Sequence, residues 1–186
     1  MTLVSTDQLN KNLNKVKIID ASWHLVKSRN AIEEYKKEHI KNAIFFDLDK
    51  NSSQKKKLSH GHFLPTINSH EKSISEMGIL NTDRIIIYCY SDLISSCRAW
   101  FQFLYFGHDP KLVAVLNGGM KKWKLEGRKV TNLKTKIIPS KYKAVENKNM
   151  IKIKSQIDKN IKKKEFTVLD ARSKKRFAPW PLFTFD

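Results

Sequence analysis

The chain has 186 residues, which is long enough for one domain with a sizeable core and short for two. Hydrophobic residues make up 40% of it and aromatic residues 10%, which excludes a disordered chain in spite of a formal net charge of +18. Only six of the 36 basic residues are arginines and the lysines are scattered, so we expect a solvated basic surface and no specific nucleic-acid partner.

Cysteine content and hydropathy bear on the compartment. The two cysteines, Cys89 and Cys97, make no disulfide framework, which fits a reducing environment. No apolar run approaches the length of a membrane span, and the opening MTLVSTDQL lacks the basic and apolar regions of a signal peptide. We therefore expect a cytoplasmic protein with no membrane partner.

Hydrophobic periodicity and turn residues predict alternating strands and helices. The expected elements, in chain order, are a helix capped by Thr6 and running to Leu13, a strand from Val16 to Asp20, a helix from Ile32 to Ile40, a strand over 43–49, a long polar loop over 50–65, a helix capped by Asn68 or Ser69 and ending at Met77, a strand from Ile85 to Cys89, a helix from Ser95 to Phe106, a strand from Val113 to Leu116 and a helix from Gly119 to Leu125.

The strands are continuous apolar runs, which is typical of a parallel sheet covered by helices on both faces. We predict a three-layer α/β domain with a mostly parallel central sheet. In such folds the functional groups gather at the carboxyl ends of the strands. Asp20, Asp47, Cys89 and Asn117 all fall at such ends.

A short internal repeat organises the chain. The stretch KIIDAS at 17–22 returns as TVLDARS at 167–173, each time an apolar strand followed by Asp-Ala. We therefore predict a first domain over residues 1–135, a lysine-rich linker over 136–165 and the opening of a second copy over 166–186.

Cys89 is the candidate nucleophile. A thiol reacts as the thiolate, and a loop of backbone amides leading into a helix N-terminus favours that form. The sequence after the strand predicts that the amides of residues 90–95 curl around the sulfur. A cysteine phosphatase is excluded, because it places an arginine six residues after the cysteine, where this chain has Ser95, and Arg98 comes nine residues after.

Nine short stretches of the chain, up to about Phe177, resemble segments of one known family in their order and spacing. They are VSTDQL, IIDASW, EYKKEHIKNAIFFDLD, HFLP, MGI, SSCRAW, FGHDP, VLNGGMKKWKLEGRKV and VLDARSKKRF. Together they resemble the two-domain sulfurtransferases of the rhodanese family, which include thiosulfate and 3-mercaptopyruvate sulfurtransferases. The resemblance implies tandem rhodanese domains, of which the first is usually inactive.

The resemblance also implies a reaction. Sulfane sulfur passes from a small anionic donor, thiosulfate or 3-mercaptopyruvate, to a thiol or cyanide acceptor through a cysteine persulfide, with no metal or organic cofactor. The usual nucleophile belongs to the second copy, at a position beyond residue 186. Cys89 stands at the equivalent place in the first copy, where Tyr90 and Asp92 replace the glycines of the active loop. Arg176 matches the arginine that binds the anionic substrate.

Three functions stay open from the sequence. The first is a sulfurtransferase in which Cys89 works, the second a non-catalytic rhodanese-like domain in which Cys89 is a small residue at a strand end, and the third a polyanion-binding module. His60 and His62 form an H-x-H pair without further ligands at metal-site spacing. The tail APWPLFTFD departs from the family pattern, for which our hypothesis is a frameshift or a misplaced gene end.

Overall fold

The structure is a computed structural model that describes residues 2–52, 63–91 and 94–171. The chain divides into two units, Met1–Lys148 and Asn149–Asp186, which are described separately below. The elements of the first unit are β1 (Thr2–Val4), α1 (Thr6–Asn10), β2 (Lys17–Asp20), α2 (Ala31–Lys37), β3 (Ala43–Phe45), α3 (Ile67–Glu76), β4 (Ile85–Tyr88), α4 (Ser96–Tyr105), β5 (Val113–Leu116) and α5 (Gly119–Leu125). None of the described helices is long and apolar enough to cross a membrane.

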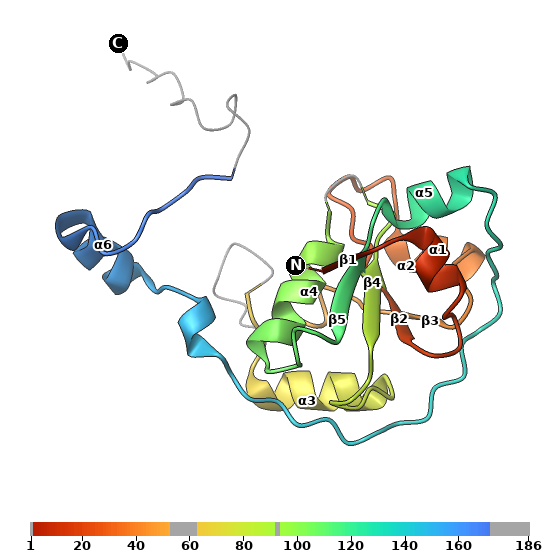
Figure 1. The fold of residues 1–186 in the computed structure, drawn as a ribbon, viewed down its shortest axis with the longest axis horizontal. Coiled ribbons are helices and arrows are strands. Elements are labelled where there is room, and N and C mark those ends of the chain that lie inside the picture. The colour runs from red at the N-terminus through yellow and green to blue at the C-terminus, as the bar shows by residue number, and fades with distance from the viewer. Residues whose placement is uncertain (1, 53–62, 92–93, 172–186) are drawn as a thin grey trace, which may run out of the picture. The chain divides into compact units, whose positions relative to one another are not determined.

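The first unit is built on a five-stranded sheet in the order β1-β5-β4-β2-β3 (Figure 1). All four pairings are parallel, as predicted. The central strand β4 pairs with β2 on one side and with β5 on the other, and all four of its residues are buried. This double burial explains why the strand is a continuous apolar run in the sequence. The edge strand β1 is an addition to the predicted elements.

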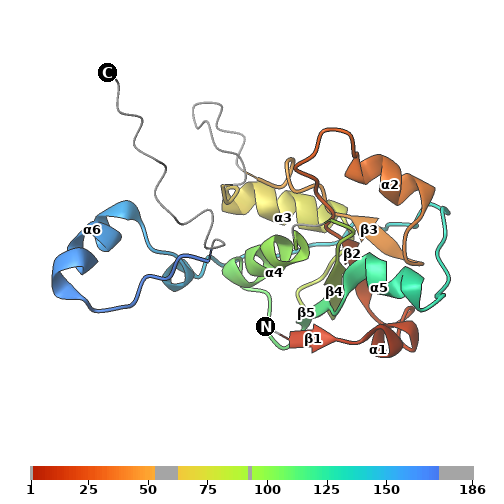
Figure 2. The ribbon, with the colours of Figure 1, turned by 90° about the horizontal axis from the view of Figure 1, so that it is seen from above.

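Helices cover both faces of the sheet, which confirms the three-layer prediction. Seen from above, α3 and α4 lie on one side and α1, α2 and α5 on the other (Figure 2). On the second side, Leu9 of α1 and Trp123 of α5 share one buried cluster with Tyr88 of β4. On the first side, the buried Phe103 of α4 packs its ring against that of Phe46, with 6.0 Å between centroids.

Two helices begin at other residues than the sequence predicts. Ser5, and not Thr6, caps α1, because Ser5 Oγ accepts the amide of Gln8 while the Gln8 side chain accepts the amide of Ser5. This reciprocal capping box satisfies two free amides at once. Thr66, and not Asn68 or Ser69, caps α3 through its side chain.

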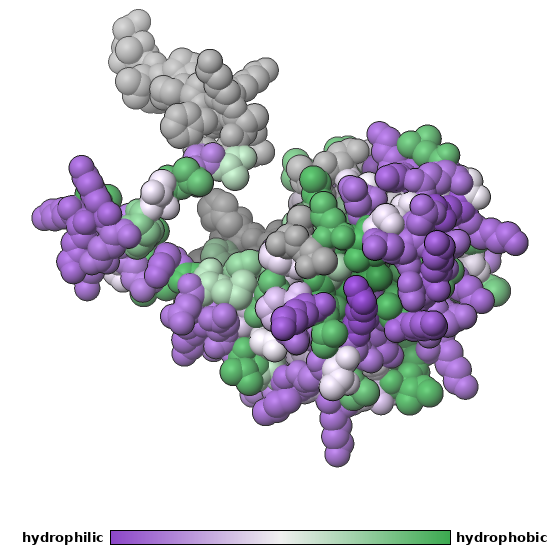
Figure 3. Space-filling view, in the orientation of Figure 1, coloured by the Kyte–Doolittle hydropathy of each residue, from purple (hydrophilic) through white to green (hydrophobic). Residues whose placement is uncertain are grey.

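Residues 136–148 belong structurally to the first unit, although the sequence suggests a linker there. The amide of Ser140 donates to the carbonyl of Ser75 at 2.8 Å, and that of Val145 donates to the carbonyl of Phe106 at 3.0 Å. This segment therefore packs as a strap on the helices of the first side. Hydrophilic residues dominate the face of the unit shown in Figure 3, as the net charge leads us to expect.

The short helix η1 (Lys148–Met150) spans the boundary between the two units, and the second unit contains α6 (Lys154–Lys163). Asn160 exchanges hydrogen bonds with the backbone of Phe166. The stretch 167–170, for which a strand is predicted, is not in a strand, and Val168 and Leu169 are exposed. In the first unit β2 pairs with a strand on each side, whereas the described part of the second unit contains no strand with which residues 167–170 could pair.

Candidate functional site

Cys89 follows β4 directly and lies at the carboxyl edge of the sheet, where the sequence places it. Its side chain is buried, with 9% of the residue surface exposed, and it lines a pocket of about 800 Å³. The pocket walls come from the start of α4 and α5, from α2 and from the loop that precedes it, with Ser96 and Gly119 among the residues beside the cysteine. The parallel sheet brings these segments together because all its strands end at this edge.

The thiol and the carbonyl of Cys89 are both engaged. The Sγ atom donates to Ser96 Oγ at 3.4 Å, and the carbonyl accepts the amide of Met120 at 3.1 Å. Gly119 lies so close that a Cβ atom there would come within 2.5 Å of the Cys89 carbonyl oxygen. The start of α5 therefore fixes the main chain at the cysteine.

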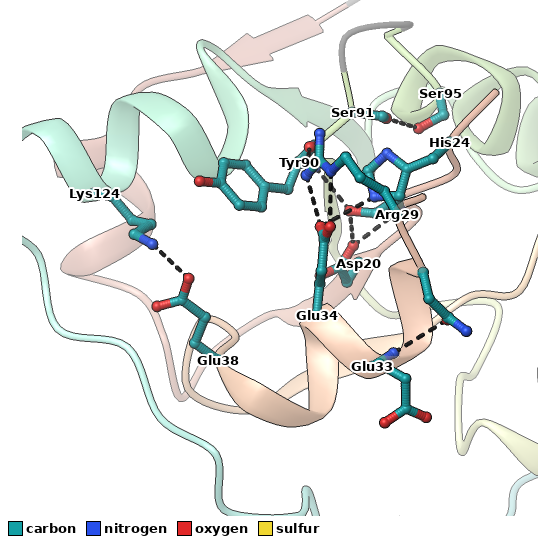
Figure 4. Close-up of polar contacts among 12 residues, drawn as sticks. Asp20, His24, Arg29, Glu33, Glu34, Glu38, Tyr90, Ser91, Ser95 and Lys124 are labelled. Carbon is teal, nitrogen blue, oxygen red and sulfur yellow. Dashed lines mark hydrogen bonds and ion pairs between the residues drawn. The ribbon is translucent and has the colours of Figure 1, made fainter. Parts of the chain in front are cut away.

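The backbone of Tyr90 is held from two sides (Figure 4). Its amide donates to Ser22 Oγ at 2.8 Å, and its carbonyl accepts Arg29 Nη2 at 3.0 Å. Ser22 is oriented in turn by Asp20, whose Oδ1 accepts both its amide at 2.9 Å and its hydroxyl at 2.5 Å. The expectation that this amide turns toward the sulfur is therefore wrong for Tyr90, because Ser22 takes the donor.

Two ion pairs neutralise the carboxylates of the pocket. Arg29 donates two hydrogen bonds to Glu34, at 2.7 Å each, and His24 Nε2 lies 3.0 Å from the same carboxylate. These hydrogen bonds from Arg29 are the main reason that the pKa of Glu34 lies below its ordinary value. Lys124 pairs with Glu38, which raises the pKa of the lysine. Figure 4 shows both pairs on the α2 side of the site.

The aspartates at the strand ends, Asp20 and Asp47, accept hydrogen bonds from residues that follow them closely in the chain. Burial raises the pKa of Asp20, and the hydrogen bonds from Ser22 counteract that rise. Asp47 Oδ1 accepts the amides of Asp49 and Lys50, which makes a local turn. Both carboxylates therefore accept local hydrogen bonds that shape the turns after their strands.

The remaining predicted residues lie apart from this site or outside the described part of the chain. Cys97 is on α4, half-buried, and its pKa is raised by burial and secondarily by Cys89. Arg176, Asp92 and the His60/His62 pair fall outside the described residues. Within the described residues, no group of three or more His, Cys, Asp or Glu side chains could hold a metal ion.

Several residues of the site carry no sequence signal that assigns them to it. Ser22 stands within a noted stretch, but only the fold shows that its hydroxyl reaches Tyr90. Arg29 and Glu34 are separated from Tyr90 by more than fifty residues of chain. Contacts of this kind follow from the order of the strands in the sheet and not from local spacing.

A profile described as "Rhodanese-like domain" matches residues 5–126, a range that includes every described residue lining the pocket, from Arg29 to Lys121. The chain belongs to the rhodanese family. This rhodanese is 34% identical over 206 residues to thiosulfate/3-mercaptopyruvate sulfurtransferase 2 of Arabidopsis thaliana, covering 96% of this chain and 59% of the relative. It is 32% identical to thiosulfate sulfurtransferase of Bos taurus, covering 87% of this chain and 54% of the relative.

A solved structure shows the same fold. SseA from Escherichia coli, whose structure is described as the "rhodanese" fold of 3-mercaptopyruvate sulfotransferases, superposes with a TM-score of 0.86 at 25% identity. The match covers 95% of this chain and 68% of SseA. The chain spans little more than half the length of the curated relatives named above.

Proposed function

We propose that this rhodanese takes part in moving sulfane sulfur from thiosulfate or 3-mercaptopyruvate to a thiophilic acceptor, with Cys89 as the persulfide carrier. The family supports sulfur transfer as the class of reaction. The observation that carries the assignment to Cys89 is its place directly after β4, where its side chain lines the pocket of about 800 Å³ at the carboxyl edge of the sheet.

The proposed reaction has two balanced steps. The Cys89 thiolate attacks the sulfur of the donor and a new S–S bond forms. The S–S bond of thiosulfate or the C–S bond of 3-mercaptopyruvate breaks, so that sulfite or the enolate of pyruvate leaves with the bonding electron pair. A thiol or cyanide acceptor then attacks the outer sulfur of the persulfide, which returns Cys89 to the thiolate. Neither step needs an external oxidant, a metal or an organic cofactor. Ser96 Oγ accepts from the thiol and can turn its own hydroxyl to donate to the thiolate.

A second candidate is a non-catalytic binding domain of the same fold. The observations that favour it are the low exposure of Cys89, at 9%, and the amide of Tyr90, which donates to Ser22 and is therefore withdrawn from any anion at the sulfur. In this case the pocket serves recognition, and sulfur transfer belongs to a cysteine elsewhere in a longer protein.

Intact-protein mass spectrometry distinguishes the two. The purified chain is incubated with thiosulfate, and separately with 3-mercaptopyruvate, next to a Cys89→Ser variant and a Cys97→Ser control. An adduct of one sulfur atom that survives in the Cys97 variant and disappears in the Cys89 variant supports the carrier role. No adduct with either donor, or one that depends on Cys97, contradicts it.

Arg176 is proposed as a ligand of the anionic donor, on the basis of the family resemblance of its surroundings in the sequence. A guanidinium suits a sulfur oxyanion or a carboxylate because it donates two parallel hydrogen bonds. Arg176→Lys keeps the charge and loses the paired donors, so a weaker donor affinity in that variant supports the role. We place the reaction in the cytoplasm, since the cysteine content fits a reducing compartment.

A further inference from the structure

The cations around the Cys89 pocket divide into two groups. Arg29 is bound to Glu34, and Lys124, which stands beside the pocket, is bound to Glu38. Lys37 and Lys121 also line the pocket, and within the described part of the chain neither has an ion pair or a side-chain hydrogen bond. Among the described lining residues three cations face two carboxylates, and Lys37 and Lys121 are the two cations without a carboxylate partner there.

The two unpaired lysines come from different walls. Lys37 is the last residue of α2, and Lys121 lies in the first turn of α5. Figure 4 shows these two helices on either side of the Tyr90 ring, whose face is already taken by Arg29 at 5.2 Å and Lys124 at 5.4 Å. A ligand that meets both lysines must therefore reach across the pocket.

The volume and the apolar lining of the pocket indicate what kind of ligand it could bind. Its volume of about 800 Å³ lies in the range of sites for small organic molecules, about 300–1,000 Å³, and an inorganic oxyanion fills little of it. The lining also includes Ile94, which is 69% exposed and offers apolar surface to a carbon skeleton, whereas Val115 and Leu116 are themselves almost fully buried. An inorganic ion leaves that surface uncovered.

We infer that this pocket binds a small organic dianion, with Lys37 and Lys121 as its two charge anchors. The inference does not depend on persulfide formation at Cys89. It applies to a sulfur donor or acceptor that carries two anionic groups, and equally to a ligand that the domain only recognises. Ion pairs at exposed lysines are weak singly, so two anchors and an apolar contact are needed for useful affinity.

The test is calorimetric titration of the whole chain with succinate, an unreactive organic dianion, at low ionic strength, with sulfate and acetate as comparison probes. Lys37→Gln and Lys121→Gln each remove one anchor. Lys111→Gln is the matched control, because this exposed lysine is also unpaired in the described structure but precedes β5, at the opposite edge of the sheet. We expect about threefold weaker succinate binding for each single variant, about tenfold for the double variant and no change for the control.

Several results would overturn the inference: no measurable succinate binding, unchanged affinity in the double variant, equal losses in all three lysine variants, or sulfate or acetate binding as tightly as succinate. Two separate readouts on the unmodified chain distinguish this inference from the sulfur-transfer proposal: calorimetry measures succinate binding, and mass spectrometry measures the sulfur adduct. Absence of the sulfur adduct would contradict the carrier role of Cys89 and leave the anion site unaffected. Absence of succinate binding would contradict the anion site and leave sulfur uptake by Cys89 unaffected.

Discussion

Gly119 is the position where a single methyl group tests how the Cys89 main chain is held. Its φ of +54° is in the left-handed region, and a Cβ atom there would lie 2.5 Å from the Cys89 carbonyl oxygen. The obstacle is backbone, so it cannot turn aside as a flexible side chain does. Gly119→Ala therefore has to displace either the start of α5 or the end of β4.

The loss in free energy of unfolding follows from two effects, the positive φ and the close approach of the Cβ atom to the Cys89 backbone. An L-residue in the left-handed region costs about 1 kcal/mol relative to glycine. Forcing extra volume into a packed site costs a further ~2 kcal/mol, and the hydrogen bond from Met120 to Cys89 is the contact most exposed to that shift. Gly119→Ala should therefore lower the free energy of unfolding by about 3 kcal/mol in total.

Gly127→Ala is the matched control. Gly127 has a similar φ of +65°, but nothing lies within 4 Å of the position a Cβ would take, so only the backbone cost of about 1 kcal/mol applies. Urea unfolding followed by circular dichroism measures both variants. A difference of about 2 kcal/mol, or roughly 6 °C in Tm, is expected between them. Equal stability of the two variants would refute the reasoning from close approach.

Three further predictions concern polar side chains of the first unit. Tyr142→Phe should cost about 1–2 kcal/mol in urea unfolding, because His108 Nδ1, 3.2 Å from the hydroxyl, keeps no donor; an unchanged midpoint would contradict this. Burial lowers the pKa of His70 from 6.5 to about 3, so the imidazole is neutral in the folded state. The free energy of unfolding should therefore fall by up to ~1.4 kcal/mol per pH unit as pH drops from 6.5 toward 3. His70→Phe should flatten this dependence on pH, and an equal slope in both proteins would exclude His70 as its source. Arg29→Gln should speed alkylation of Cys89 by iodoacetamide severalfold, because the backbone beside the cysteine loses a guanidinium donor, whereas an unchanged rate would show that this contact does not restrain it.

Much of the fold follows from local patterns in the sequence. The continuous apolar runs at Ile85–Tyr88 and Val113–Leu116 are strands buried on both faces, and they predict a parallel sheet because only such sheets bury both faces of their strands. Gly78, Gly107 and Gly127 adopt positive φ at the ends of helices, as the sequence indicates. The place of Cys89 directly after a central strand follows from the same patterns.

The tertiary structure decided the rest, because the remaining contacts join segments far apart in the chain. The three-residue strand β1 is too short to show a period, and its pairing with β5 places it at the edge of the sheet. The segment 136–148 is lysine-rich in sequence, and its hydrogen bonds to Ser75 and Phe106 and the burial of Tyr142 and Ala144 make it part of the first unit.

The candidate site shows the same division. The sequence by itself determined which residue ends the central strand, and hence that a thiol lies at the carboxyl edge of the sheet. Only the tertiary structure decided that Ser22 and Arg29 hold the backbone after that thiol, and that Lys37 and Lys121 have no acidic partner among the described residues. The physical reason is that strand and helix formation depend on neighbouring residues, whereas the pairing of charges depends on which loops the sheet brings together.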